Sequence, residues 1–149
     1  MKKISILFSL LVLATNTYAA LPKDIAQLQG RAGVLVTTQN GKVVANESNI
    51  HCTVEESQYG EGSVIIEAST YFTPTAHLKG ASREVSGSIV QYTTVSTGKR
   101  PGGSVCGDII PLTSYKQTVT VTPNSLSIKE KFSCAVFDRN EVVQTCSLK

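Results

Sequence analysis

The chain has no tryptophan and only one methionine, and aromatic residues make up 6% of its 149 residues. Internal repeats, low-complexity tracts and heptads are also missing, which argues against solenoid and filament architectures. The scarcity of aromatic side chains removes the two girdles that a transmembrane β-barrel needs at the membrane interfaces. We therefore expect a protein without a membrane span in its mature chain.

Charge of either sign is not in large excess, with 14 Lys and Arg against 11 Asp and Glu. Loss of Lys2 and Lys3 with an N-terminal signal would leave 12 basic residues against the same 11 acidic ones. Nucleic-acid binders need a basic footprint for the phosphates, so nucleic acid is not an expected partner. Paired CxxC and HxxxH spacings are missing, and His51 and His77 stand apart, so we predict no metal and no cofactor.

Patterns for nucleophilic catalysis are missing as well, since no G-x-S-x-G or similar local motif occurs. A glycosidase would need two carboxylates at a defined separation in space. Spacing along the chain does not reveal that separation for the four candidates, Glu55, Glu56, Glu67 and Asp108. An enzyme is therefore less expected than a binding protein.

The N-terminus has the three parts of an export signal. Two lysines follow Met1, an apolar run covers Ile4–Ala14, and small residues stand at the positions that a signal peptidase reads, Thr17 and Ala19. We predict a signal peptide over residues 1–19, cleaved after Ala19, and one disulfide-bonded domain over residues 20–149. The predicted location is the periplasm or the extracellular space.

Four cysteines lie in the predicted mature chain, and an even number in an exported protein indicates two disulfides. They are Cys52, Cys106, Cys134 and Cys146. Three pairings are possible, and the strand register below favours Cys134–Cys146 together with Cys52–Cys106.

The C-terminal residues predict three antiparallel strands. Apolar side chains alternate with polar ones in Tyr115–Thr122 and in Leu126–Val136, and a tight turn at Pro123–Asn124 makes the two apolar faces coincide. A second turn at Arg139–Glu141 would place Cys134 across from Cys146, and Phe132 across from Leu148. This register predicts a disulfide between neighbouring strands.

The same register places Gln117 opposite Glu130 on the inward face, with Gln144 on that face as well. These three residues form a candidate interior polar site. One interpretation is a hydrogen-bonded pair near a barrel end, or a bulge that turns Glu130 outward. The other is a polar patch inside a ligand cavity, because a buried carboxylate is costly unless it is paired.

The preceding residues predict further hairpins. Asn40–Gly41 is a strong turn signal that would set Thr38 opposite Val43 and Val36 opposite Ala45. Farther on, Cys52 and Val54 would face Ala68 and Ile66, with His51 outside. The alternation in Arg83–Ser96 changes faces around Gly87, which indicates a bulge or a long bent strand. Leu21–Gly30 predicts one or two helical turns.

Together these segments predict an all-β antiparallel meander of about eight strands with a short N-terminal helix. We expect a small up-and-down barrel or a barrel-like sandwich, and a Greek-key sandwich is the alternative. The helix, Gly30 and the following meander resemble the lipocalin-like calycins in architecture. The Gly-x-Trp signature of that family would need Trp at Ala32, so no family is assigned.

The segment Thr97–Gly103 is the most loop-like part of the chain. Its candidate binding residues are Lys99, Arg100, Gly102 and Gly103. A solvated hairpin connection is the simpler interpretation of the same composition.

For function, we predict an exported binding module that recognises a protein or a small ligand through loops or the barrel mouth. A secreted hydrolase inhibitor that inserts Lys99 or Arg100, and an envelope-associated structural protein, are the alternatives. The oligomeric state stays open.

Overall fold

The computed structural model describes residues 20–58, 62–70, 75–97, 106 and 110–149, without the side chains of residues 137–139. The predicted signal peptide, residues 1–19, lies outside the described residues and stays a prediction.

The described residues form ten strands in one antiparallel sheet, so the predicted all-β class is confirmed. The hydrogen-bonded order is β5-β4-β3-β1-β10-β9-β8-β7-β6, with β2 paired to β1 alone. The elements are α1 (Lys23–Ala26), β1 (Ala32–Gln39), β2 (Lys42–Val43), a 3₁₀ turn (Ala45–Glu47), β3 (Ile50–Glu56), β4 (Ser63–Ala68), β5 (Thr75–His77), β6 (Ser82–Ser86), β7 (Ile89–Ser96), β8 (Leu112–Thr122), β9 (Ser125–Cys134) and β10 (Phe137–Leu148).

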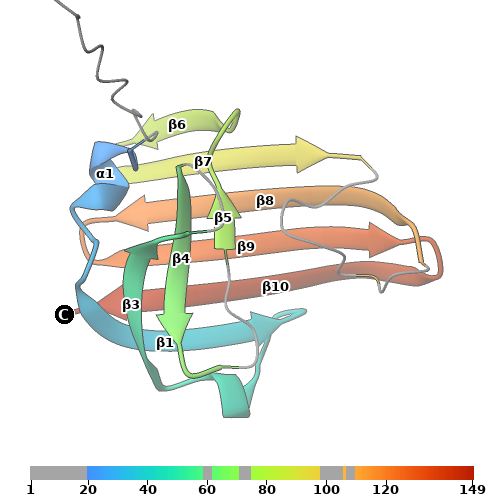
Figure 1. The fold of residues 1–149 in the computed structure, drawn as a ribbon. Coiled ribbons are helices and arrows are strands. Elements are labelled where there is room, and N and C mark those ends of the chain that lie inside the picture. Colours follow the sequence, from blue (N-terminus) through green and yellow to red (C-terminus); the bar gives the residue numbers. More distant parts are fainter. Residues whose placement is uncertain (1–19, 59–61, 71–74, 98–105, 107–109) are drawn as a thin grey trace, which may run out of the picture.

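The sheet curls into a half-barrel. β1 pairs with β10, so the first and last strands meet in the middle of the sheet, and β3 and β4 cross in front of β7–β10 (Figure 1). Among the described residues, backbone pairing ends at β5 on one side and at β6 on the other. The core lies between the crossing layers.

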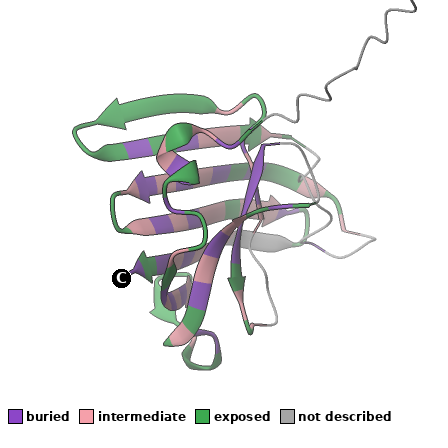
Figure 2. Cartoon of the chain, turned by 60° about the vertical axis from the view of Figure 1, so that its left-hand side comes forward, coloured by how far each residue is buried: buried purple, intermediate pink, exposed green. Residues whose placement is uncertain are grey.

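Inward-facing side chains of both layers make up that core, which Figure 2 shows as buried bands that alternate along the strands. Ile25 of α1 and Leu28, just after it, are both fully buried, so the N-terminal helical segment closes one end of the core. Asp24 fixes it there by accepting a 2.8 Å hydrogen bond from the Tyr92 hydroxyl. Burial, and then the bond to Asp24, raise the pKa of Tyr92.

The Asn40–Gly41 turn forms as predicted, with both residues in the left-handed region at φ 49° and 78°. Thr38 pairs with Val43, but the expected Val36–Ala45 pair does not form. Ala45 begins the 3₁₀ turn instead, because β2 pairs with β1 over only two residues before the chain turns toward β3.

A hairpin replaces the bulge or bent strand predicted for Arg83–Ser96. Ser86 pairs with Ile89 around a two-residue turn that contains Gly87 at φ 59°. A turn of this length makes Val85 the partner of Val90, so odd positions before it share a face with even positions after it. The change of faces in the sequence thus marks a turn.

The β9–β10 turn lies earlier than the sequence predicted. Cys134 pairs with Phe137, and Phe132 pairs with Asn140 instead of Leu148, so the Arg139–Glu141 turn is wrong. From Asn140 onward, the two registers differ by an even number of residues, which leaves the strand side chains on their predicted faces. The alternation of apolar and polar faces therefore could not decide between the two registers. The pairing of Tyr115 with Phe132 and of Val121 with Leu126 is confirmed.

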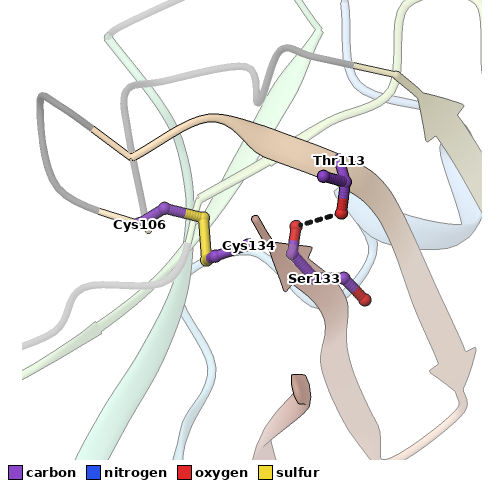
Figure 3. Close-up of a disulfide and its surroundings, with 4 residues drawn as sticks. All are labelled: Cys106, Thr113, Ser133 and Cys134. Atoms are coloured by element: carbon purple, nitrogen blue, oxygen red, sulfur yellow. Dashed lines mark hydrogen bonds between the residues drawn. A yellow bond between two sulfur atoms is a disulfide. The ribbon is translucent and has the colours of Figure 1, made fainter. Parts of the chain in front are cut away.

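The favoured disulfide pairing is wrong for the same reason. With the turn moved, Cys146 lies opposite Leu126 and cannot reach Cys134. Cys52 of β3 bonds to Cys146 of β10, with 6.1 Å between their Cα atoms. Cys106 bonds to Cys134, with 5.8 Å between their Cα atoms (Figure 3).

Candidate functional site

Two residues of the predicted interior polar site lie together on the inward face of β8 and β9. Gln117 lies opposite Glu130, and its amide nitrogen donates a 3.1 Å hydrogen bond to the Glu130 carboxylate. The Tyr115 hydroxyl donates a second bond, of 2.7 Å, to the same oxygen. Two donors therefore hold this carboxylate, and Glu130 does not turn outward through a bulge.

Gln117 also reaches the edge strand β5. Its amide nitrogen donates to the carbonyl of Thr75 at 3.0 Å, and its amide oxygen accepts from the backbone N–H of His77 at 3.3 Å. The hydroxyl of Thr94 donates to the carbonyl of His77 at 3.3 Å. Side chains of β7 and β8 thus bond to the edge of β5 that is not paired with another strand among the described residues. These contacts alone provide hydrogen-bond partners for the buried side-chain amide of Gln117, so no ligand is needed to explain its burial. The hypothesis of a ligand cavity stays a prediction.

The third residue of the predicted interior site, Gln144, lies on the same inward face one strand away. Gln144 is buried on the inward face of β10, beside Thr37 and Ile128. His51 is exposed as predicted, and His77 instead bonds to the Ser63 hydroxyl at 2.9 Å. The candidate binding loop with Lys99, Arg100, Gly102 and Gly103 lies outside the described residues, so the loop and the inhibitor alternative stay predictions.

The outward face of β7–β10 brings together charged residues that the sequence analysis did not group. Lys116 of β8 lies directly opposite Lys131 of β9, and Lys129 lies two residues farther along β9, opposite Thr118. Like charges in directly opposed positions repel one another. We call Gln91, Lys116, Thr118, Thr120, Lys129 and Lys131 the outward patch.

One carboxylate partly balances the outward patch. Glu141 of β10 accepts from the ammonium groups of Lys131 and Lys129, at 2.9 and 3.1 Å. These hydrogen bonds, from Lys131 first and then Lys129, hold the pKa of Glu141 below its ordinary value. No ion pair to Lys116 occurs within the described part of the chain. Two of the three ammonium groups therefore share one carboxylate, and the third has none among the described residues.

Two hollows adjoin along this face. The first has a volume of about 440 Å³ and is lined by the six residues of the outward patch. The second, of about 360 Å³, shares Lys116 and Lys131 with the first and continues past Val95, Ser114 and Ser133. Both volumes lie in the range of small-molecule sites, from about 300 to 1,000 Å³. The face thus offers space together with a positive potential.

The sequence carried a signal for this arrangement. The polar sides of Tyr115–Thr122 and Leu126–Val136 contain all three lysines, and the confirmed register aligns them. Glu141 could not be assigned to them, because the predicted turn placed it outside the strands.

Comparison of the chain with protein-family models and with curated proteins gives no match. Among solved structures, it is similar to the crystal structure of a "putative outer membrane protein" of Bacteroides fragilis, with a TM-score of 0.43 and 11% identity. The likeness covers 85% of this chain and 52% of that one. The chain thus spans about half the length of that protein, and nothing about function follows from a likeness of this extent.

In the described part of the chain, no helix has the length and apolar character needed to cross a membrane.

Proposed function

We propose that the protein is an exported binding module whose outward patch binds an anionic ligand. The observation that carries this proposal is the opposition of Lys116 and Lys131, with Lys129 beside them, along a hollow of about 440 Å³. The predicted signal peptide and the two disulfides support export into an oxidising compartment.

A bound anion would reduce the repulsion among the three lysines, which Glu141 balances only in part. Glu141 neutralises one of the three positive charges in this row of side chains, and Lys116 stands outside that ion pair. Phosphate, sulfate or carboxylate groups can accept hydrogen bonds from more than one ammonium group. The binding free energy should depend strongly on salt, because all three lysines are solvated.

Chemical-shift mapping with inorganic pyrophosphate tests the proposal. We expect the amide signals of Lys116, Thr118, Lys129 and Lys131 to move together, and the Lys116→Gln/Lys131→Gln variant to bind at least tenfold more weakly. A matched control, Lys42→Gln/Lys149→Gln, removes the same net charge from exposed lysines elsewhere and should bind as the wild type does. Shifts scattered over all lysines, or equal losses in both variants, would contradict the proposal.

Glu141 supplies a test in the opposite direction. Because its carboxylate competes with the ligand for Lys129 and Lys131, Glu141→Gln should bind pyrophosphate more tightly, by about threefold to tenfold. The control Glu67→Gln makes the same change of net charge at an exposed residue of β4. An equal gain in both variants would show that only the net charge of the protein matters.

A further inference from the structure

The two adjoining hollows extend the outward patch beyond the size of one anionic group. They meet at Lys116 and Lys131, so each hollow has these two lysines in its wall. Neighbouring strands are about 4.8 Å apart, and alternate residues of one strand about 6.8 Å apart. The lysines thus stand at intervals that suit several anionic groups on one extended molecule.

Neutral hydrogen-bonding groups lie between the cations. Thr118 and Thr120 line the first hollow with Gln91, whose amide donates to the Thr120 hydroxyl at 3.4 Å, and Ser114 and Ser133 line the second. Hydroxyl and amide groups both donate and accept hydrogen bonds, which suits a ligand that carries hydroxyl groups as well as charge.

Resting on the proposed function, we infer that the ligand is an acidic polysaccharide that lies along the outward face of β8 and β9 and occupies both hollows. Its carboxylate, sulfate or phosphate groups bind Lys116, Lys129 and Lys131, and its sugar hydroxyls bond to Thr118 and Thr120 in the first hollow and to Ser114 and Ser133 in the second. An anionic membrane is a weaker fit, because these lysines form the walls of hollows and the residues between them are hydroxyl-bearing rather than apolar.

Oligogalacturonates of one, three and six units test this inference by isothermal titration calorimetry. The hexamer should bind at least tenfold more tightly than the trimer, because only the hexamer is long enough to occupy both hollows. Equal affinity of hexamer and trimer would overturn the inference, as would tighter binding to vesicles of anionic phospholipid than to the hexamer.

A charge-neutral variant separates this inference from the proposed function. Ser114→Ala/Ser133→Ala removes two hydroxyls that line only the second hollow and lie outside the outward patch. We expect about fivefold weaker hexamer binding and unchanged pyrophosphate binding. The control Thr38→Val changes an outward threonine of β1, away from both hollows, and should have no effect.

The outcomes are distinguishable. Weaker hexamer binding with retained pyrophosphate binding in the double serine variant supports the inference. If the wild type binds pyrophosphate but not the hexamer, or if the double serine variant binds the hexamer normally, the saccharide assignment fails while the anion site stands. If neither probe binds, the proposed function fails too.

Discussion

Gly33 shows how one residue shapes this fold. It lies in β1 between Cys52 of β3 and Leu148 of β10, on the inward face that the Cys52–Cys146 disulfide crosses. A Cβ atom at this position would meet the backbone carbonyl oxygen of Ser147, and would lie 2.8 Å from its carbonyl carbon and 3.1 Å from the Cys146 sulfur. Only glycine lets the two flanking strands approach this closely.

We predict that Gly33→Ala lowers the free energy of unfolding by about 3 kcal/mol, at the upper end of overpacking in a dense core. The neighbours are mainly backbone atoms, so the added methyl group must push β10 away from β1. Chemical denaturation measures this loss as a lower denaturation midpoint with an unchanged m-value.

Gly80→Ala is the control for backbone conformation alone. Gly80 has φ 77° and nothing within 4 Å of an added Cβ atom, so its substitution should cost about 1 kcal/mol. A loss for Gly33→Ala no larger than this would show that β1 and β10 separate easily.

At the scale of elements, β5 is the least conventional part of the sheet. It has three residues, pairs with β4 on one side and receives side-chain hydrogen bonds on the other. The Gln117 amide bonds to the Thr75 carbonyl and the His77 N–H as a neighbouring backbone would. Unpaired strand edges favour aggregation, and here side chains cover one of them.

Gln117→Leu should therefore destabilise the protein by about 2 to 4 kcal/mol, because it leaves two backbone groups of β5 without these partners. Hydrogen exchange should show faster exchange in β4 and β5 than in β8 and β9. The control Gln39→Leu replaces an exposed glutamine of β1 and should change stability by less than about 0.5 kcal/mol. Unchanged exchange in β5 would show that Gln117 is not what holds this strand.

The hairpins also show how far elements could be predicted from the sequence. Turns with a strong local signal, such as Asn40–Gly41 and Pro123–Asn124, lie where the sequence predicts them, and the second sets the pairing of Val121 with Leu126. The β9–β10 turn has no such signal. Its register differed by an even number of residues, so alternation of faces gave the same result for the right and the wrong pairing.

For the whole molecule, the two disulfides are nested. Cys52–Cys146 spans 94 residues and ties β3 to β10, and Cys106–Cys134 spans 28 residues within that interval. The outer bond therefore encloses most of the sheet, including every strand of the outward patch. The inner bond links Cys106 to the end of β9.

Chain entropy predicts a larger effect for the outer bond. Replacing Cys52 and Cys146 by Ala should lower stability by about 4.7 kcal/mol, and replacing Cys106 and Cys134 by about 3.6 kcal/mol. Both outer cysteines are fully buried, so the lost packing adds to the difference in the same direction. Thermal and urea unfolding of the two double variants compare these losses, and a larger loss for the inner pair would contradict the loop-length argument.

The candidate site depended on contacts that only the whole fold provides. Face alternation showed that Lys116, Lys129 and Lys131 are polar positions, but their grouping required the β8–β9 register and their balance required Glu141 on β10. The interior pair of Gln117 and Glu130 was predicted from one hairpin. The hydrogen bonds from Gln117 to β5 could not be predicted from the sequence, because β5 reaches this pair only when the sheet curls.

The nested disulfides also set an order of events during biosynthesis. A chain that enters an oxidising compartment from its N-terminus presents Cys52 first and Cys106 next, while Cys146, the native partner of Cys52, comes last of the four cysteines. Joining cysteines in order of arrival would give Cys52–Cys106 and Cys134–Cys146, and neither bond is native. Maturation should therefore require thiol–disulfide exchange, and the yield of native protein should fall in an exporting host that lacks a disulfide isomerase.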